Sequence, residues 1–266
     1  MKKLFLSADI EGTCGIADWK ETELGEAQGE YFRAEMTKEV AAACEAAIAA
    51  GAEDILVKDA HSSGRNIDPS KLPEQARILR SWTRDPQVMM AGLDSSFEGV
   101  LFTGYHSPAG SDGNPLAHTM NGGNVWVKIN GVQASEFLIN AYTAASLKVP
   151  VLFLSGDEAL CAFAEGMGWG IRTAAVSRGV GNASISVHPN VAQRMIREGV
   201  AAAMAEPPAL AGQYLPRRFD VEIRFKEHYL AHRGSFFPGA QKVGTHEVAF
   251  SASNWRDALV FLFFVL

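Results

Sequence analysis

The chain has 266 residues, of which 47% are hydrophobic and 20% charged, a mixture typical of a folded globular protein rather than a disordered one. Its formal net charge of −6 argues against nucleic acid or an anionic membrane surface as a partner. The cysteines Cys14, Cys44 and Cys161 are odd in number and lack paired spacing, so they predict no disulfide framework and suit a reducing cytoplasm.

Neither end of the chain predicts a membrane segment. The apolar stretch 4–6 is too short for the core of a signal peptide, and Asp9 and Glu11 follow it closely, so we predict a first strand over 4–8. The apolar segment 258–266 is far shorter than the roughly 20 residues of a membrane span. We expect it to form a final helix in the core or at a subunit interface.

Strand and helix patterns alternate through the first half of the chain. After the first strand, apolar residues recur every four positions and predict one face of a long helix that Gly51 ends: Phe32, Met36, Val40, Cys44 and Ile48. A compact strand over 55–58 follows. Further strands are predicted over 77–81, 88–91 and 99–105.

The second half begins with a hairpin signal, because Asn130-Gly131 separates two short β-rich runs over 125–129 and 132–134. Ser135 is a candidate cap for the helix that follows it. The later elements are predicted in this order: a strand over 149–155, a helix to 165, a strand over 173–176, a helix over 189–204, strands over 221–225 and 246–251, and a last helix capped by Asn254.

This alternation is typical of an α/β protein with a mostly parallel sheet covered by helices. The hairpin and the segment after Pro207-Pro208 predict an added, smaller α+β lobe. The chain contains no internal repeat and no low-complexity linker. We therefore expect a single domain over residues 1–266, with a possible sub-lobe from about 209 to 266.

Metal-capable side chains follow several of the predicted strands. Asp9 and Glu11 follow the first strand, Asp59 and His61 follow the second, and His106 follows a later one. Ligands of open α/β sheets bind outside the carboxyl ends of the strands, so these side chains are expected at one edge of the sheet. The alternation of a strand would also place Asp9 and Glu11 on the same face.

Glu136, at the start of the helix after the hairpin, is expected to join them. Each position alone has an ordinary explanation, since Asp favours turns, a lone histidine is often a core or surface residue, and Glu136 can complement a helix N-terminus. Together they favour a metal site, because several unrelated strand and turn ends would each need a separate explanation.

The donor set indicates which metal chemistry to expect. Carboxylates and imidazoles without a thiolate suit Zn²⁺, Mn²⁺ or Co²⁺ in a catalytic site. Five such ligands exceed the roughly three that a single catalytic zinc takes, and they suffice for two ions if one carboxylate bridges them. The residues alone therefore predict a dinuclear metal hydrolase.

At these residues the sequence resembles the zinc-dependent D-aminopeptidase family, typified by the bacterial dipeptide-operon D-aminopeptidase. The resemblance rests on ordered motifs between residues 7 and 157: SADIEGTCGI, VKDAHSS, GLDSSFEGVLFTGYHS, AHTMNG, NGVQASEFLINAY and PVLFLSGD. Weaker similarity in TAAVSRGVG and VGTHEVAF extends it over nearly the full chain.

The resemblance implies two zinc ions per subunit and a role for each candidate residue. Asp9 resembles the carboxylate that bridges both ions, Glu11 and His106 resemble the remaining ligands of one ion, and His61 and Glu136 those of the other. His118, in the AHTM motif, matches the catalytic histidine of the family.

The family also implies an activity and an assembly. It implies an aminopeptidase that removes an N-terminal D-residue such as D-Ala from short peptides, and a homodecamer of stacked pentamers. Three alternatives stay open at this point: a dinuclear hydrolase of another amide or of a phosphate ester, a non-catalytic metal-binding scaffold, and a coincidental cluster without metal.

Overall fold

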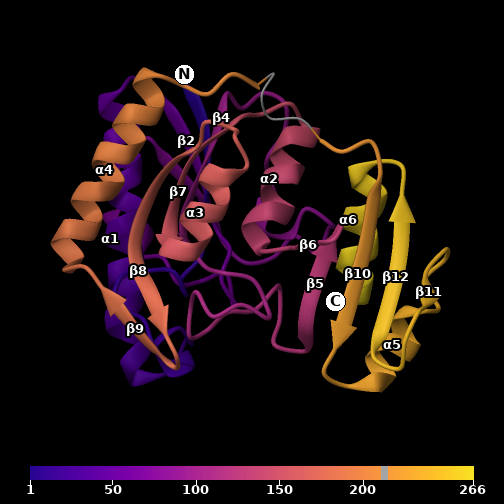
Figure 1. Ribbon diagram of the computed structural model, residues 1–266. Coiled ribbons are helices and arrows are strands. Elements are labelled where there is room, and N and C mark those ends of the chain that lie inside the picture. Colours follow the sequence, from indigo (N-terminus) through magenta and orange to yellow (C-terminus); the bar gives the residue numbers. More distant parts are fainter. Residues whose placement is uncertain (211–214) are drawn as a thin grey trace.

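The larger of two β-sheets contains seven strands (Figure 1). Across the sheet they run β3 (Ala76–Leu79), β2 (Asp54–Asp59), β1 (Lys3–Ala8), β4 (Gly99–Tyr105), β7 (Val151–Asp157), β8 (Arg172–Val180) and β9 (Ala183–Ser186). All neighbouring strands pair in parallel except β8 and β9. This computed structural model describes residues 1–210 and 215–266, and it confirms the predicted α/β fold with a mostly parallel sheet.

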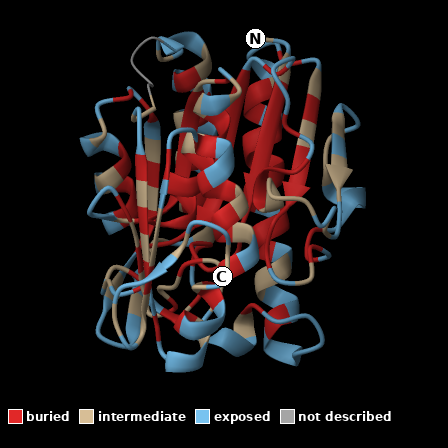
Figure 2. Cartoon of the chain, turned by 90° about the vertical axis from the view of Figure 1, so that its right-hand side faces the viewer, coloured by how far each residue is buried: buried red, intermediate tan, exposed pale blue. Residues whose placement is uncertain are grey.

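Helices cover both faces of this sheet. α1 (Ala27–Ala49) and α4 (Pro189–Ala205) share one core cluster with Leu4 and Leu6 of β1. Phe5 points to the opposite face, into the cluster that α2 (Glu136–Ser146) and α3 (Glu158–Gly166) cover. The central strands are therefore buried on both sides, as Figure 2 shows, and this explains their almost continuous apolar sequences.

The long helix α1 follows the predicted apolar face. Met36, Val40 and Cys44 are buried in the core, and Phe32 and Ile48 pack against the edge of the same cluster. The helix ends close to Gly51, whose φ of +101° suits a residue without a side chain.

The smaller sheet has five antiparallel strands. They run in the order β11 (Gln241–Lys242), β12 (Glu247–Ala252), β10 (Phe219–Phe225), β5 (Asn124–Ile129) and β6 (Val132–Gln133). α5 (His228–Gly234) and α6 (Trp255–Val265) pack against it, so the predicted smaller α+β lobe is confirmed. The sub-lobe boundary near residue 209 stays a prediction, since residues 211–214 lie outside the described part of the chain.

The smaller sheet draws β5 and β6 from the middle of the sequence, and α2 joins the two sheets. Phe137 of α2 belongs to the core of the larger sheet, whereas Leu138 and Ile139 belong to the core of the smaller one. Figure 1 shows α2 between the two sheets. The first turn of α2 is therefore held from both sides.

The hairpin before α2 forms as predicted. Ile129 pairs with Val132, and Asn130 and Gly131 have φ values of 52° and 80°, the positive values of a two-residue primed turn. Ser135 then caps α2, because its Oγ accepts a hydrogen bond of 3.1 Å from the backbone N–H of Leu138.

One predicted strand is wrong. The segment 88–91 is not extended: Val88–Met90 form a 3₁₀-helix, η3, in which the N–H of Met90 donates to Gln87 O at 2.8 Å. Met89, Met90 and Ala91 are buried, which produced the strand-like pattern, but Val88 has a φ of 46° that no strand adopts. The strand predicted over 77–81 is present as β3 and ends at Leu79.

The sequence pattern missed several short elements. These are β9, β11, α5 and the 3₁₀-helices η1 (Trp19–Glu21) and η2 (Pro69–Lys71). The apolar C-terminal segment forms α6 and packs into the core of the smaller sheet, as one of its two expected roles. Across residues 1–210 and 215–266, no helix has both the length and the apolar character needed to cross a membrane.

Candidate metal centre

Three neighbouring strands deliver candidate ligands to one edge of the larger sheet. Asp9 directly follows β1, and its neighbours β2 and β4 lead into His61 and His106. Because β1, β2 and β4 run in parallel, their carboxyl ends meet at the same edge. The first residue of α2, Glu136, reaches this edge from the side of the smaller sheet.

Glu11 reaches the site through a turn rather than through strand alternation. β1 ends at Ala8, and the turn that follows packs against the backbone of β4. The N–H of Gly12 donates to Gly104 O at 2.8 Å, and a Cβ at Gly12 would lie 1.8 Å from Tyr105 O. Only glycine permits this close approach, which holds Glu11 beside the end of β4.

The first group of candidate ligands consists of Asp9, Glu11 and His61. His61 Nδ1 lies 3.4 Å from Asp9 Oδ1 and 3.1 Å from Glu11 Oε2. All three side chains are at least 94% buried. One carboxylate oxygen from each acid and one imidazole nitrogen therefore face a common point.

The second group consists of Asp9, His106 and Glu136. His106 Nε2 lies 3.6 Å from Asp9 Oδ2 and 3.7 Å from Glu136 Oε2. Asp9 thus turns one carboxylate oxygen toward each group. A carboxylate in this position can bridge two cations.

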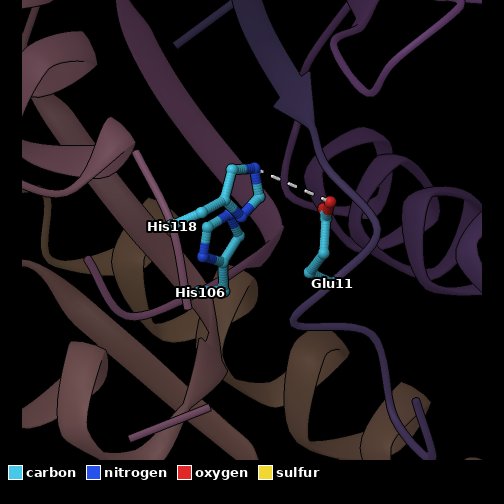
Figure 3. Close-up of side chains that lie close together, drawn as sticks. All are labelled: Glu11, His106 and His118. Atoms are coloured by element: carbon cyan, nitrogen blue, oxygen red, sulfur yellow. Dashed lines mark ion pairs between the residues drawn. The ribbon is translucent and has the colours of Figure 1, made fainter. Parts of the chain in front are cut away.

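His118 lies beside both groups, on the loop between β4 and β5. Its Nε2 is 3.4 Å from Glu136 Oε1 and 3.9 Å from Glu11 Oε1, and its ring lies against that of His106 (Figure 3). The His118 side chain is 14% exposed, whereas that of His106 is fully buried. Trp19 contacts the His118 ring edge-on, with centroids 5.1 Å apart.

Backbone carbonyls orient all three imidazoles. His61 Nε2 lies 3.1 Å from Thr22 O, His106 Nδ1 2.9 Å from Ser107 O, and His118 Nδ1 2.9 Å from Leu116 O. Because a carbonyl oxygen only accepts, each of these nitrogens carries the hydrogen and donates it. The other nitrogen of each neutral ring then turns a lone pair toward the carboxylates, as in metal-binding histidines.

Several buried polar atoms of this site have no hydrogen-bond partner among the described residues. They are Asp9 Oδ2, Glu11 Oε2 and His106 Nε2. Buried polar atoms without partners are costly and rare in folded proteins. Their convergence on the faces of the two groups fits a pair of divalent cations, so the residues present suit the zinc that the resemblance implies.

The charges of the site point to the same need for a cation. Burial raises the pKa of Asp9 well above its ordinary value, and the neighbouring Glu11 carboxylate adds to this. Burial also opposes ionisation of Glu136, yet the imidazoles of His106 and His118 bring the pKa of Glu136 down to about 2. Three buried carboxylates are stable together only with positive charge, which protonated imidazoles or divalent cations can supply.

The same balance acts on the histidines. Burial lowers the pKa of His106, but the carboxylates of Glu136, Glu11 and Asp9 outweigh it and raise this pKa to about 10. A proton on His106 Nε2 and a cation beside it are alternative ways of balancing these carboxylates. Metal binding at this site would therefore release protons.

A cavity of about 380 Å³ opens onto the candidate ligands, at the small end of the range usual for ligand sites. Asp9, Glu11, His61, His118 and Glu136 belong to its wall. Trp19 from η1 and Trp82 from the loop after β3 line the same cavity. A small molecule can thus reach the carboxylates and the exposed edge of His118 together.

The structure brings together all six residues singled out in the sequence. Two ligand groups share Asp9, one with Glu11 and His61 and the other with His106 and Glu136, whereas a third group joins Glu11 with His106 and His118. The pairing of ligands implied by the resemblance, Glu11 with His106 and His61 with Glu136, stays a prediction. The Asp59 carboxylate forms no hydrogen bond or ion pair with the His61 ring. Its carboxylate accepts hydrogen bonds from the N–H groups of Asn66 and Ile67, and it therefore holds the loop that carries His61.

Sequence patterns missed the carbonyl of Thr22 that orients His61, because no side-chain motif marks a backbone oxygen. The remaining histidines belong to none of the ligand groups found among the described residues: His188, His228, His232 and His246. Cys14 is buried and donates its thiol hydrogen to Val187 O, as expected of a packing residue.

Comparison with known proteins connects this geometry to an activity class. A family model described as D-aminopeptidase matches residues 1–264. The chain is 31% identical over 258 residues to the D-aminopeptidase of Bacillus subtilis (strain 168), covering 96% of this chain and 93% of that protein. Its fold is similar to that of the Zn-dependent D-aminopeptidase DppA from Bacillus subtilis, a self-compartmentalizing protease, with a TM-score of 0.91, 30% identity, and coverage of 99% of this chain and 96% of that one.

Proposed function

The chain belongs to the D-aminopeptidase family, and on that premise we propose that it is a zinc-dependent aminopeptidase that removes an N-terminal D-residue, such as D-Ala, from short peptides or amides. One observation carries the proposal: Asp9 is shared by two groups of buried ligands, and Asp9 Oδ2, Glu11 Oε2 and His106 Nε2 in these groups have no hydrogen-bond partner among the described residues.

We propose two zinc ions per subunit, held by two sets of ligands. Glu11 and His61 would complete one set, His106 and Glu136 the other, with Asp9 common to both. The grouping of the ligand atoms, which lie within 4.8 Å of one another in each set, supports this assignment. When bound, zinc supplies Lewis acidity toward the substrate carbonyl and makes water a better nucleophile.

Side chains of the protein would transfer the proton and shield the reacting groups from water. His118 is the proposed proton donor to the departing amine, since its Nε2 faces the carboxylates and its Nδ1 is held by Leu116 O. The buried Glu136 carboxylate, 3.4 Å from His118 Nε2, stabilises the imidazolium that forms between turnovers. Trp19 covers the ring and limits access of water.

The experiment that tests the function compares D-alanine amide with L-alanine amide, on protein stripped of metal and on protein reloaded with zinc. We expect zinc-dependent release of ammonia, faster from the D-amide. Turnover of a phosphate ester with none of either amide would identify another dinuclear hydrolase. Metal-dependent folding without turnover of any substrate would identify a scaffold.

We further propose that the chain acts in the cytoplasm as a homo-oligomer, a decamer of stacked pentamers. All three cysteines lie in the described part of the chain as free, buried thiols, which suits a reducing compartment. Phe236 and Phe264 expose 74% and 65% of their surface, and the related DppA is a self-compartmentalizing protease. Sedimentation velocity measures the subunit number, and a monomer would contradict this part of the proposal.

A further inference from the structure

The cavity beside the candidate metal centre has an unequal distribution of charge. Four carboxylates line it, those of Asp9, Glu11, Glu23 and Glu136. Among the residues found in its wall, Arg84 is the one lysine or arginine. Apart from the imidazoles and any cations of the metal centre, positive charge in the wall is therefore confined to the loop after β3.

Arg84 has no partner of its own within the described chain. Its guanidinium forms neither an ion pair nor a side-chain hydrogen bond with any residue in the ranges 1–210 and 215–266, and the residue is exposed. An arginine presents five N–H donors in a fork that matches a carboxylate. Arg84 is thus free to bind an anionic group that enters the cavity.

The loop holds Arg84 at a defined place. On one side, the N–H of Ser81 donates to Gly64 O at 2.7 Å, and the indole N–H of Trp82 donates to Ser62 O at 2.7 Å. Both acceptors belong to the loop that carries His61. On the other side, the N–H of Gln87 donates to the Asp85 carboxylate at 2.8 Å.

The nearby lysine is committed elsewhere. Lys58 Nζ donates to the carbonyl oxygens of Asp59 and Ser81, and it lies 4.2 Å from the centre of the Trp82 ring. Burial accordingly lowers the pKa of Lys58 to about 8. Lys58 thus binds the backbone of the loop after β3 and does not belong to the cavity wall, whereas Arg84 does.

We propose that Arg84 binds the C-terminal carboxylate of the substrate and so sets the preference of the enzyme for short peptides with a free C-terminus. The inference rests on the proposed aminopeptidase function. A short peptide carries an ammonium group at one end and a carboxylate at the other, and the cavity offers acids at the metal centre and a guanidinium on the loop of β3. An amidated or long peptide would not place a carboxylate at Arg84.

The test measures binding as well as turnover, so that it does not depend on the proposed reaction. D-Alanyl-D-alanine and its C-terminal amide are titrated calorimetrically into zinc-loaded protein carrying His118→Ala, which is expected to bind without hydrolysis. We expect the free acid to bind about tenfold more tightly than the amide, and Arg84→Gln to remove this difference. In the enzyme with His118 intact, Arg84→Gln should raise the KM for the free acid about tenfold. The kcat and the KM for the amide should change little.

Two further variants separate recognition from structure. Arg84→Lys keeps a positive charge and should retain part of the preference for the acid. Arg80→Gln removes the same charge from an exposed position outside the cavity wall and should retain the full preference for the acid.

Equal binding of acid and amide by protein with Arg84 intact, or an unchanged preference in Arg84→Gln, would overturn the inference even if the enzyme hydrolyses D-amides. Absence of zinc-dependent hydrolysis with the binding preference intact would overturn the proposed function instead.

Discussion

The imidazole rings of His106 and His118 stack, with their centroids 4.3 Å apart and their planes inclined by 11°. The two rings direct their Nε2 atoms to different oxygens of Glu136, at 3.7 Å and 3.4 Å. One ring is fully buried and the other reaches the cavity. This division suits metal ligation by His106 and proton transfer by His118.

His118→Ala tests this division of roles. We expect kcat to fall by roughly 10²–10⁴-fold, because the leaving amine loses its proton donor. The zinc content should stay at two per subunit, since five other ligands remain. Steady-state kinetics and elemental analysis on the same sample measure both quantities.

The matched control is His188→Ala, which changes a histidine outside the ligand groups and should leave both quantities unchanged. Loss of one zinc ion from His118→Ala would make His118 a ligand, because its Nε2 also forms a group with Glu11 and His106. Near-normal turnover would remove it from the mechanism.

The shared carboxylate of Asp9 predicts a specific pattern of metal loss. Asp9→Asn should empty both positions, because each group loses a charged ligand. Glu136→Gln should empty one and leave the position formed by Asp9, Glu11 and His61 filled. Elemental analysis after dialysis against a weak chelator counts the ions in each variant.

The pairing of the remaining ligands follows from the same experiment. In the structure Glu11 lies with His61, so Glu11→Gln and His61→Ala should empty the same position. The double variant should then still hold one ion. If it holds none, the ligands are paired as the family resemblance implies, with Glu11 and His61 on different ions.

Strand positions explain how much of this site the sequence could predict. Long apolar strands mark their own ends, so the sequence pattern alone places Asp9, His61 and His106 at one edge of the sheet. Glu136 followed from the Asn130-Gly131 turn, which is a local signal. His118 lies on a loop without hydrophobic periodicity, and only the family resemblance identified it.

Non-local pairing explains why the sequence patterns did not show which strands lie side by side. β5 joins β10, and Val127 pairs with Ile223 across a long separation in sequence, which no local pattern specifies. The segment 88–91 failed for a different reason. Its methionines are buried like those of a strand, but the positive φ of Val88 depends on the surrounding packing.

The close contact between the Asp9 turn and β4 predicts a strong effect for Gly12→Ala. A Cβ there would lie 1.8 Å from Tyr105 O, so either the turn or the strand must move. We expect the free energy of unfolding to fall by roughly 1–3 kcal/mol and zinc affinity to fall as well, because the turn carries Asp9 and Glu11.

Gly166→Ala is the matched control, since a Cβ on this residue of α3 meets nothing within 4 Å. It should leave stability unchanged or raise it slightly. Denaturant unfolding and zinc titration compare the two variants. Equal stabilities would mean that the turn adapts without cost and does not fix the ligands.

A buried acid outside the metal centre predicts how stability depends on pH. Glu39 of α1 is 2% exposed, its Oε1 accepts a hydrogen bond of 3.0 Å from the N–H of Cys14, and its Oε2 has no partner among the described residues. Burial raises the pKa of Glu39 to about 8, only partly opposed by the Cys14 N–H, and the nearby Glu35 adds to the increase. The side chain is thus protonated in the folded protein at neutral pH.

The sign of the effect follows from proton uptake. Between the ordinary pKa of 4.5 and the folded value of about 8, the folded state binds the proton that the unfolded state has lost. The contribution of Glu39 to stability is therefore complete below pH 4.5 and falls as pH rises to about 8, by up to about 1.4 kcal/mol per pH unit. Glu39→Gln removes this loss. The free energy of unfolding of the variant, relative to that of the parent protein, should therefore increase as the pH rises across that range.

Urea unfolding at several pH values between 5 and 9 measures the difference in free energy of unfolding between the variant and the parent protein. Glu30→Gln changes an exposed acid of the same helix, and its difference from the parent protein should be the same at every pH. If the free energies of unfolding of Glu39→Gln and the parent protein differ by the same amount at every pH, Glu39 ionises normally in the folded state. Its carboxylate would then need a cationic partner or water that enters beside α1.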